Sequence, residues 1–183
     1  MRCEPTAEVM SHRQLTIITG PIDSGKTSWC GELSAANPEC AGVLLLKVYL
    51  RAERIGYDAL RLPAGERIPF ARIGGHEPPG WIAGERVGPF SISAAGLQAA
   101  NAWLSEAAVE PADIIVDEIG PLELAGGGLS PGLRAVLASP LQQKLWVVIR
   151  SDCLTAACHH FDISGYKLVE VGAGPGKTGP GNA

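Results

Sequence analysis

Long apolar runs are missing from this sequence of 183 residues, and none approaches the roughly 20 residues that a membrane-spanning helix needs. The first dozen residues contain no continuous apolar segment, so we expect no secretion signal. Basic residues do not outnumber acidic ones either: the net charge is −4, which argues against a nucleic-acid-binding surface. We therefore expect a cytoplasmic protein that has neither a nucleic acid nor a membrane as its partner.

Cysteine is also scarce. Five cysteines form an odd and scattered set rather than a paired disulfide framework, which predicts reduced thiols. Cys153, Cys158, His159 and His160 lie close together but lack the paired spacings of a structural zinc site, so ordinary buried thiols are expected there. The remaining composition, 46% hydrophobic and 19% charged residues, is typical of one globular domain.

The strongest positive feature is the segment 20–27, GPIDSGKT, which fits G-x-x-x-x-G-K-[ST] at every fixed position. A short apolar and β-branched run, 15–19, precedes it, and a helical pattern follows it. Glycines allow backbone angles that turn successive N–H groups toward phosphate oxygens, and the helix N-terminus adds a positive dipole end. The motif therefore predicts a phosphate-binding loop of the Walker A type.

Residue roles in this loop follow from the chemistry of a triphosphate. Lys26 is predicted to reach the β- and γ-phosphates, and the Thr27 hydroxyl to bind Mg²⁺. The predicted nucleotide-binding residues are Gly20, Pro21, Ile22, Asp23, Ser24, Gly25, Lys26, Thr27 and Ser28.

The rest of the chain alternates strand-like and helix-like segments, which predicts an α/β fold with ligands at the carboxyl ends of parallel strands. Two polar segments, 55–60 and 67–72, have no helical pattern between them and are expected to pair antiparallel. A Gly/Pro-rich loop is predicted over 74–84, and it is expected to cover part of the ligand. Further strands are predicted at 41–48, 87–92, 113–118, 145–149 and 166–171, with helices at 97–107 and 130–137.

These segments predict three parts of unequal size. Residues 14–171 form the domain, 1–13 are an N-terminal extension, and 172–183 are a Gly/Pro-rich disordered tail.

Two acids and one arginine complete the predicted site. Asp117 ends a buried apolar strand, where Mg²⁺ would find a fixed oxygen ligand of the Walker B type. Glu118, one residue further, is predicted to orient or deprotonate an attacking water. Phosphoryl transfer usually needs a further cation, and Arg150, which follows another strand, is the best internal candidate. The predicted catalytic residues are Glu118, Lys26 and Arg150, and the predicted metal ligands are Thr27 and Asp117.

Together with the phosphate-loop motif, three further strings fall in order along the chain: 54–58 (RIGYD), 86–90 (RVGPF) and 117–124 (DEIGPLEL). From about Gln14 to Val171, the chain resembles the cancer-related (thermophilic-type) nucleoside-triphosphatase family. This resemblance implies a three-layer P-loop NTPase fold (RecA-like) with a mostly parallel central sheet plus antiparallel strands. It also implies Mg²⁺-dependent hydrolysis of ATP, GTP and other nucleoside triphosphates, with broad base tolerance and slow turnover.

The sequence departs from the family pattern near the predicted site. Pro121 stands where the family usually has a lysine, and Arg150 follows a strand after which the family often has a histidine. The segment 45–47, LLK, replaces a Thr-Glu-Glu stretch, so acids give way to apolar residues and a base. These departures concern turnover and substrate rather than nucleotide binding.

Two other functions remain open from the residues alone. A small-molecule kinase would use the same loop together with an acceptor pocket. A regulatory or assembly module would bind nucleotide with little turnover, and its protein partner is unknown.

Overall fold

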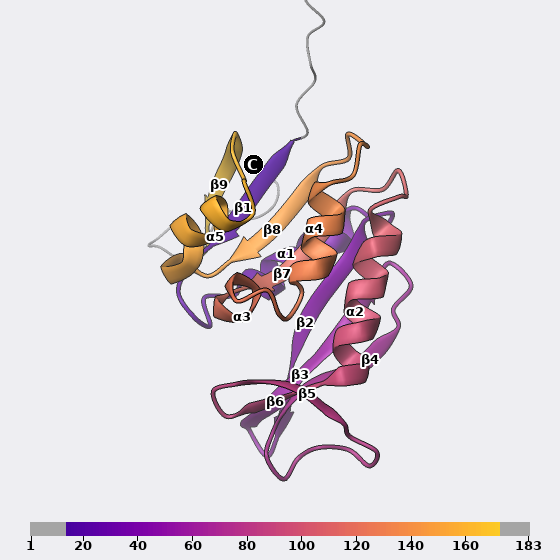
Figure 1. The fold of residues 1–183 in the computed structure, drawn as a ribbon, viewed down its shortest axis with the longest axis vertical. Coiled ribbons are helices and arrows are strands. Elements are labelled where there is room, and N and C mark those ends of the chain that lie inside the picture. The colour runs from indigo at the N-terminus through magenta and orange to yellow at the C-terminus, as the bar shows by residue number, and fades with distance from the viewer. Residues whose placement is uncertain (1–13, 173–183) are drawn as a thin grey trace, which may run out of the picture.

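The computed structural model describes residues 14–172, which form one nine-stranded sheet with helices on both of its faces (Figure 1). The predicted extension 1–13 and, apart from Gly172, the predicted tail 172–183 lie outside the described residues. No helix within residues 14–172 is long and apolar enough to cross a membrane. The strands are β1 (Leu15–Thr19), β2 (Ala41–Leu50), β3 (Glu53–Leu62), β4 (Arg67–Ile73), β5 (Ala83–Val87), β6 (Phe90–Ser93), β7 (Ile114–Ile119), β8 (Leu145–Ile149) and β9 (Tyr166–Glu170).

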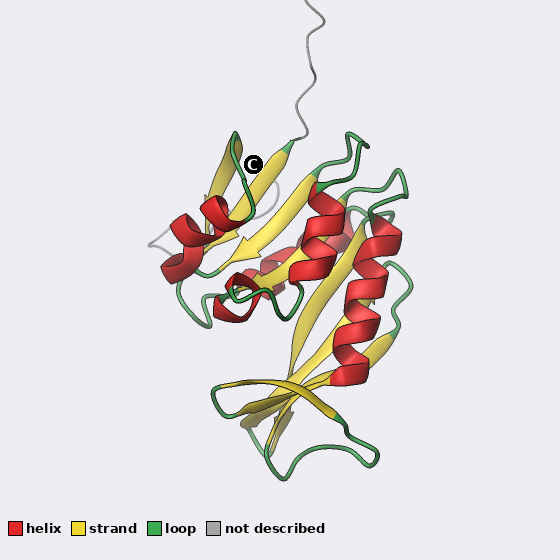
Figure 2. Cartoon of the chain, in the orientation of Figure 1, coloured by secondary structure: helices red, strands yellow, loops and turns green. Residues whose placement is uncertain are grey.

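Within the described residues, five α-helices connect or flank these strands, and Figure 2 colours the helices red. They are α1 (Lys26–Ala36), α2 (Ala94–Ala107), α3 (Pro121–Leu124), α4 (Ser130–Leu137) and α5 (Leu154–His160), with a short 3₁₀ turn, Ser151–Cys153, before α5.

The strand order is β5-β6-β4-β3-β2-β7-β8-β1-β9. From β2 to β9 the neighbouring strands pair parallel, whereas β2 to β5 pair antiparallel. The predicted α/β fold with parallel and antiparallel strands is therefore confirmed as a mixed sheet. Parallel pairing brings the ends of β1, β7 and β8 to one edge, where the phosphate loop follows β1 and the two acids lie in the last residues of β7.

Consecutive residues of the central strands serve two separate cores, which explains why these strands read as continuous apolar runs. Ile17 packs with α2, α4 and α5 on one face, whereas Ile18 packs with Trp29 and Leu33 of α1 on the other. Both isoleucines are fully buried. The result is a three-layer arrangement: among the helices of residues 14–172, α1 packs on one face of the sheet, and α2, α4 and α5 pack on the other.

One predicted strand was wrong, and one short helix was not predicted. The segment 87–92 is not one strand: β5 ends at Val87, Gly88 with φ 54° and Pro89 form a hairpin turn, and Phe90 begins β6. The short helix α3 was not predicted, since four residues are too few to show a helical pattern.

β2 lies unusually close to the strand that carries the acids. An ideal Cβ on Gly42, whose φ is +128°, would lie 2.0 Å from the carbonyl oxygen of Ile115 in β7. No side chain fits there without moving one strand, so a glycine allows the parallel pairing of β2 and β7.

We predict that Gly42→Ala destabilises the protein by more than about 2 kcal/mol, because the added methyl group collides with backbone. Urea unfolding followed by circular dichroism measures the effect. Gly31→Ala is the matched control: nothing lies within 4 Å of its Cβ position in α1, so helix propensity should stabilise it by roughly 0.5–1 kcal/mol. Equal stabilities of the two variants would contradict the close approach.

Candidate active site

The loop between β1 and α1 has the backbone conformation of an anion cradle. Gly25 precedes α1 with φ 95°, and Asp23 is also left-handed, with φ 61°. Within residues 14–172, no side chain caps the first turn of α1. Its free N–H groups and positive dipole end therefore face the loop, which favours a bound anion.

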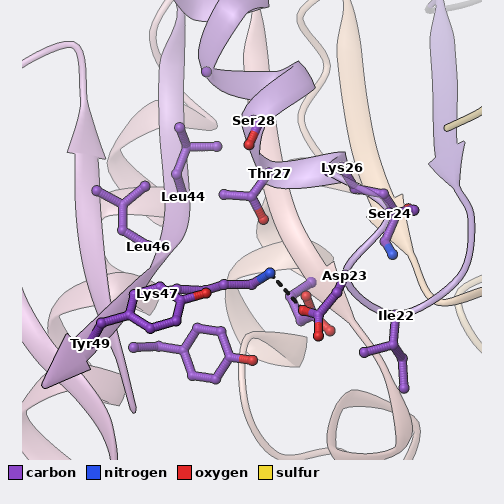
Figure 3. Close-up of a pocket in the computed structure, with 14 residues that line it drawn as sticks. Ile22, Asp23, Ser24, Lys26, Thr27, Ser28, Leu44, Leu46, Lys47 and Tyr49 are labelled. Atoms are coloured by element: carbon purple, nitrogen blue, oxygen red, sulfur yellow. Dashed lines mark hydrogen bonds and ion pairs between the residues drawn. The ribbon is translucent and has the colours of Figure 1, made fainter. Parts of the chain in front are cut away.

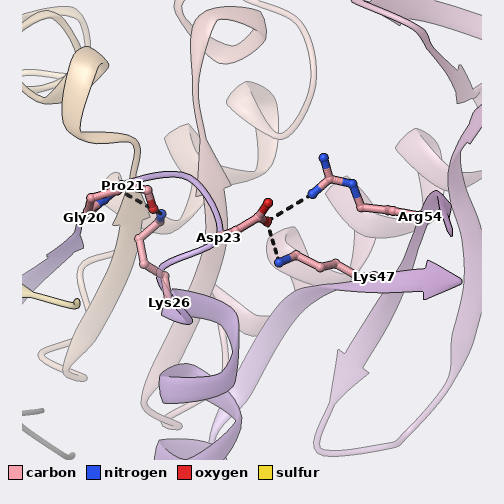
Figure 4. A network of polar contacts seen from close by, with 6 residues as sticks. All are labelled: Gly20, Pro21, Asp23, Lys26, Lys47 and Arg54. Atoms are coloured by element: carbon pink, nitrogen blue, oxygen red, sulfur yellow. Dashed lines mark hydrogen bonds and ion pairs between the residues drawn. The ribbon is translucent and has the colours of Figure 1, made fainter. Parts of the chain in front are cut away.

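Lys26 is the first residue of α1 and is buried, with 7% of its surface exposed. Its ammonium donates hydrogen bonds to two loop carbonyls, Gly20 O at 3.0 Å and Pro21 O at 2.7 Å (Figure 4). A buried cation needs such partners, and these carbonyls hold it inside the curve of the loop.

Asp117 is completely buried at the end of β7. Its Oδ2 accepts a hydrogen bond from the Leu45 N–H of β2 at 3.0 Å, whereas Oδ1 has no hydrogen-bond partner among residues 14–172. Burial, and then the neighbouring charge of Glu118, raise the pKa of Asp117 to about 7, although Thr27 and Lys26 oppose this shift. An unpaired buried carboxylate oxygen close to a threonine hydroxyl fits a divalent cation that prefers oxygen ligands.

Glu118 has a strained backbone, with φ 67° in a residue that is not glycine. This conformation interrupts the pairing of β7 with β8, whose register shifts between Val116 and Ile119. Glu118 lines two cavities. Such strain is concentrated at functional sites.

The larger cavity has a volume of about 480 Å³ and joins the phosphate loop to the β2–β3 hairpin (Figure 3). Glu118 of β7 and Tyr57 of β3 both line it. Its remaining lining consists of Ile22, Asp23, Ser24, Gly25, Lys26, Thr27, Ser28, Gly31, Leu44, Leu46, Lys47 and Tyr49. The predicted loop residues from Ile22 to Ser28 therefore share one cavity with Glu118, while Gly20 and Pro21 hold Lys26.

Two residues of this region were missed by sequence reasoning. Lys47 of β2 and Arg54 of β3 both contact Asp23 Oδ1, at 2.6 Å and 3.0 Å (Figure 4). The hydrogen bond from Lys47 lowers the pKa of Asp23, and Asp23 in turn raises the pKa of Lys47. Two sequence signals existed for them: Lys47 is the base within the departing segment 45–47, and Arg54 begins the RIGYD string.

Arg150 lies beside a second, smaller cavity of about 230 Å³, which Glu118 also lines. Its guanidinium donates to both carboxylate oxygens of Asp152, at 3.0 Å and 2.5 Å. This ion pair raises the pKa of Arg150. The second cavity is mostly apolar, and Tyr57, Phe70 and Phe90 are among its walls.

The loop predicted over 74–84 does not cover either cavity, since within the described chain no residue of 74–84 lines them. Trp81 instead donates its indole N–H to Ser91 Oγ at 3.0 Å. The loop therefore belongs to the β5–β6 end of the sheet, and the expected cover was wrong.

Glu123 explains the end of the DEIGPLEL string. It is buried and accepts hydrogen bonds from the N–H groups of Gly120 at 2.8 Å and Leu129 at 3.1 Å. Burial raises its pKa to about 7, while these donors act in the opposite direction. Glu123 thus holds the segment that follows Glu118 in place, through the N–H groups of Gly120 and Leu129.

We predict that Asp117→Asn stabilises the protein at pH 8, when nucleotide is omitted and EDTA is present. The unfolded carboxyl ionises near pH 4 and the folded one near 7, so ionisation favours unfolding as the pH rises through this interval. The gain should be on the order of 4 kcal/mol at pH 8, because each pKa unit corresponds to about 1.4 kcal/mol, and it should shrink toward pH 5. Urea unfolding across this pH range, with exposed Glu39→Gln as control, measures it. A less stable Asp117→Asn protein at pH 8 would contradict the raised pKa.

Comparisons with known proteins agree with this geometry. The family described as NTPase matches residues 15–171. Nucleoside-triphosphatase THEP1 of Methanopyrus kandleri is 27% identical over 122 residues, which cover 64% of each chain. Nucleoside-triphosphatase THEP1 of Pyrobaculum aerophilum is 31% identical over 124 residues, which cover 66% of this chain and 65% of the relative. These alignments thus span slightly less than two thirds of each relative's own length.

Two solved structures have similar folds. The solution structure of a human cancer-related nucleoside triphosphatase has a TM-score of 0.63 and 25% identity, covering 87% of this chain and 89% of the other. The crystal structure of THEP1 from Aquifex aeolicus has a TM-score of 0.65 and covers 92% of both chains. At 20% identity, this second likeness shows the fold alone.

Proposed function

The chain belongs to the NTPase family, and from this premise we propose that it is a magnesium-dependent nucleoside-triphosphatase with broad base tolerance. The observation that carries the proposal is one cavity lined by Lys26, Thr27 and Glu118, beside the buried carboxylate of Asp117. The names of its relatives, nucleoside-triphosphatases, support the same reaction. No base-reading motif is recognised in the sequence, which agrees with a broad choice of base.

In the proposed reaction, the loop N–H groups and the start of α1 bind the phosphate chain. Lys26 exchanges the carbonyls of Gly20 and Pro21 for phosphate oxygens and stabilises the charge that develops on them. Glu118 orients a water toward the γ-phosphate and accepts its proton. Glu118 combines a left-handed backbone, with φ 67°, and a place in the wall of the larger cavity, which supports this role.

Mg²⁺, when bound, would neutralise charge on the phosphate oxygens, with Thr27 and Asp117 as the residues that hold it directly or through water. The unpaired Oδ1 of Asp117 supports this assignment. Because a ligating carboxylate must be ionised, the raised pKa of Asp117 implies that metal binding weakens below pH 7.

We predict that Glu118→Gln lowers the turnover number for nucleoside triphosphate by about 100-fold or more, because the amide cannot accept the proton of water. Binding of a non-hydrolysable triphosphate should change little, since glutamine keeps the size of the side chain. Lys26→Ala should abolish binding itself. Phosphate release from ATP, GTP, CTP and UTP, with and without Mg²⁺, and calorimetric titration measure both effects.

The matched control for this experiment is Glu110→Gln, an exposed acid that precedes β7 and therefore lies at the opposite edge of the sheet. It should hydrolyse triphosphate like the unmodified protein. An unchanged turnover number in Glu118→Gln would contradict the proposed role of this acid. Hydrolysis of only one of the four nucleoside triphosphates would contradict the broad base tolerance.

A second candidate function is phosphoryl transfer to a small hydroxyl compound, and the smaller cavity favours it. Hydrolysis by water requires no apolar cavity, yet Glu118 also lines a cavity with aromatic walls, which could hold an organic acceptor. An acceptor oxygen would bond to the γ-phosphorus, the bond to the β–γ bridging oxygen would break, and Glu118 would take the hydroxyl proton. The nucleoside diphosphate would leave.

The two functions differ in what the purified protein does alone. A triphosphatase releases one phosphate for each diphosphate formed, without an added acceptor. A kinase would form diphosphate faster when 4-hydroxyphenylacetate, an aromatic hydroxyl probe, is added, and would release less free phosphate per diphosphate. Equal yields and unchanged rates with the probe would exclude transfer to this acceptor.

A further inference from the structure

One carboxylate of the phosphate loop is shared by two cations from the β2–β3 hairpin. The Lys47 ammonium lies 2.6 Å from Asp23 Oδ1, and the Arg54 guanidinium lies 3.0 Å from the same oxygen (Figure 4). The second oxygen of Asp23 takes no part in these contacts. Two positive charges thus compete for one acceptor, and the cluster carries a net charge of +1.

An acid in a phosphate-binding loop should by itself repel a polyphosphate. One cation is sufficient to neutralise Asp23, so the other is available for a second anion. The Asp23 side chain is 54% exposed, and those of Lys47 and Arg54 are 31% and 30% exposed. Ion pairs as exposed as these contribute little stability, so exchanging one of them for a phosphate costs little.

The position of Lys47 decides which of the two cations faces the ligand. β2 pairs with β7 only as far as Val43, opposite Val116, and then continues past the edge of the parallel sheet. Lys47 therefore lines the same cavity as Lys26 and Glu118, whereas Arg54 lines the smaller cavity. The Arg54 guanidinium also lies over the ring of Tyr57, 5.6 Å from its centre, which holds it in place.

The surroundings of Tyr57 connect this cluster to the acid of the proposed reaction. Charges of Arg54, Glu118, Lys47 and Asp23 all act on its hydroxyl, although burial is the main cause of its raised pKa. Lys47, Tyr57 and Glu118 thus line one cavity together with Lys26 of the phosphate loop.

We propose that Lys47 binds the γ-phosphate of the triphosphate and is transferred to it from Asp23, while Arg54 stays on Asp23 and keeps that carboxylate neutralised. This inference rests on the proposed function, because it assumes a triphosphate in the loop. Arg150 is less suited to the same role, since its guanidinium is already engaged by both oxygens of Asp152.

The test compares affinities for a non-hydrolysable triphosphate and for the diphosphate, measured by calorimetry with Mg²⁺. Lys47→Met should weaken triphosphate binding by about 10-fold or more and leave diphosphate binding within about 3-fold, because only the γ-phosphate loses a charged partner. Lys47→Arg should keep most of the preference for triphosphate. Lys144→Met, which removes an exposed charge before β8, is the control and should behave like the unmodified protein.

A second comparison tests the role of Arg54. Arg54→Met should also weaken triphosphate binding, because Asp23 then retains Lys47, and adding Asp23→Asn to it should restore binding. A merely structural arginine would show no such rescue. The inference is overturned if Lys47→Met keeps the preference for triphosphate, or if Arg150→Met loses it instead. If the unmodified protein binds neither nucleotide, the proposed function fails first, and the inference fails with it.

Discussion

The parallel pairing of β2, β7, β8 and β1 is the constraint on which the rest of the site depends. It brings the end of β1, where the phosphate loop begins, to the same edge as the end of β7, where Asp117 lies. The hydrogen bond from Leu45 N–H to Asp117 then fixes the carboxylate against β2. This carboxylate is wholly buried, and one of its oxygens has no hydrogen-bond partner in the described part of the chain, so its ionised form is unfavourable there.

The two lysines that line the larger cavity each contact an oxygen that a phosphate oxygen could replace. Lys26 is held by neutral carbonyls, and Lys47 by a half-exposed carboxylate that also binds Arg54. Both lysines can exchange these partners for a phosphate, because a backbone carbonyl or an exposed carboxylate binds a lysine less strongly than a phosphate does. Arg150 and Asp152 form the opposite case, because both carboxylate oxygens are used. The cavity therefore presents exchangeable cations on two sides.

Much of this architecture is predictable wherever the pattern is local. Strands buried on both faces appear in the sequence as apolar runs. The strand predicted at 145–149, for example, has the same bounds as β8. The antiparallel pairing of β3 and β4 was predicted because no helical pattern separates the two segments, and it is confirmed. The hairpin at Gly88 had a local signal, the Gly88-Pro89 dipeptide, but the apolar residues on both sides of it favoured one continuous strand. The loop over 74–84 could be predicted as a loop but not placed, since its packing depends on the far end of the sheet.

The sequence by itself determined that a loop of the form G-x-x-x-x-G-K-T stands between a strand and a helix, and that two acids end another strand. Local chemistry was sufficient for this, because backbone conformation and strand burial depend on neighbouring residues. Only the tertiary structure decided that Lys47 and Arg54 meet Asp23, and that Glu118 lies between two cavities. Those contacts join residues 24 to 31 positions apart, and their geometry depends on how far β2 extends beyond the parallel sheet.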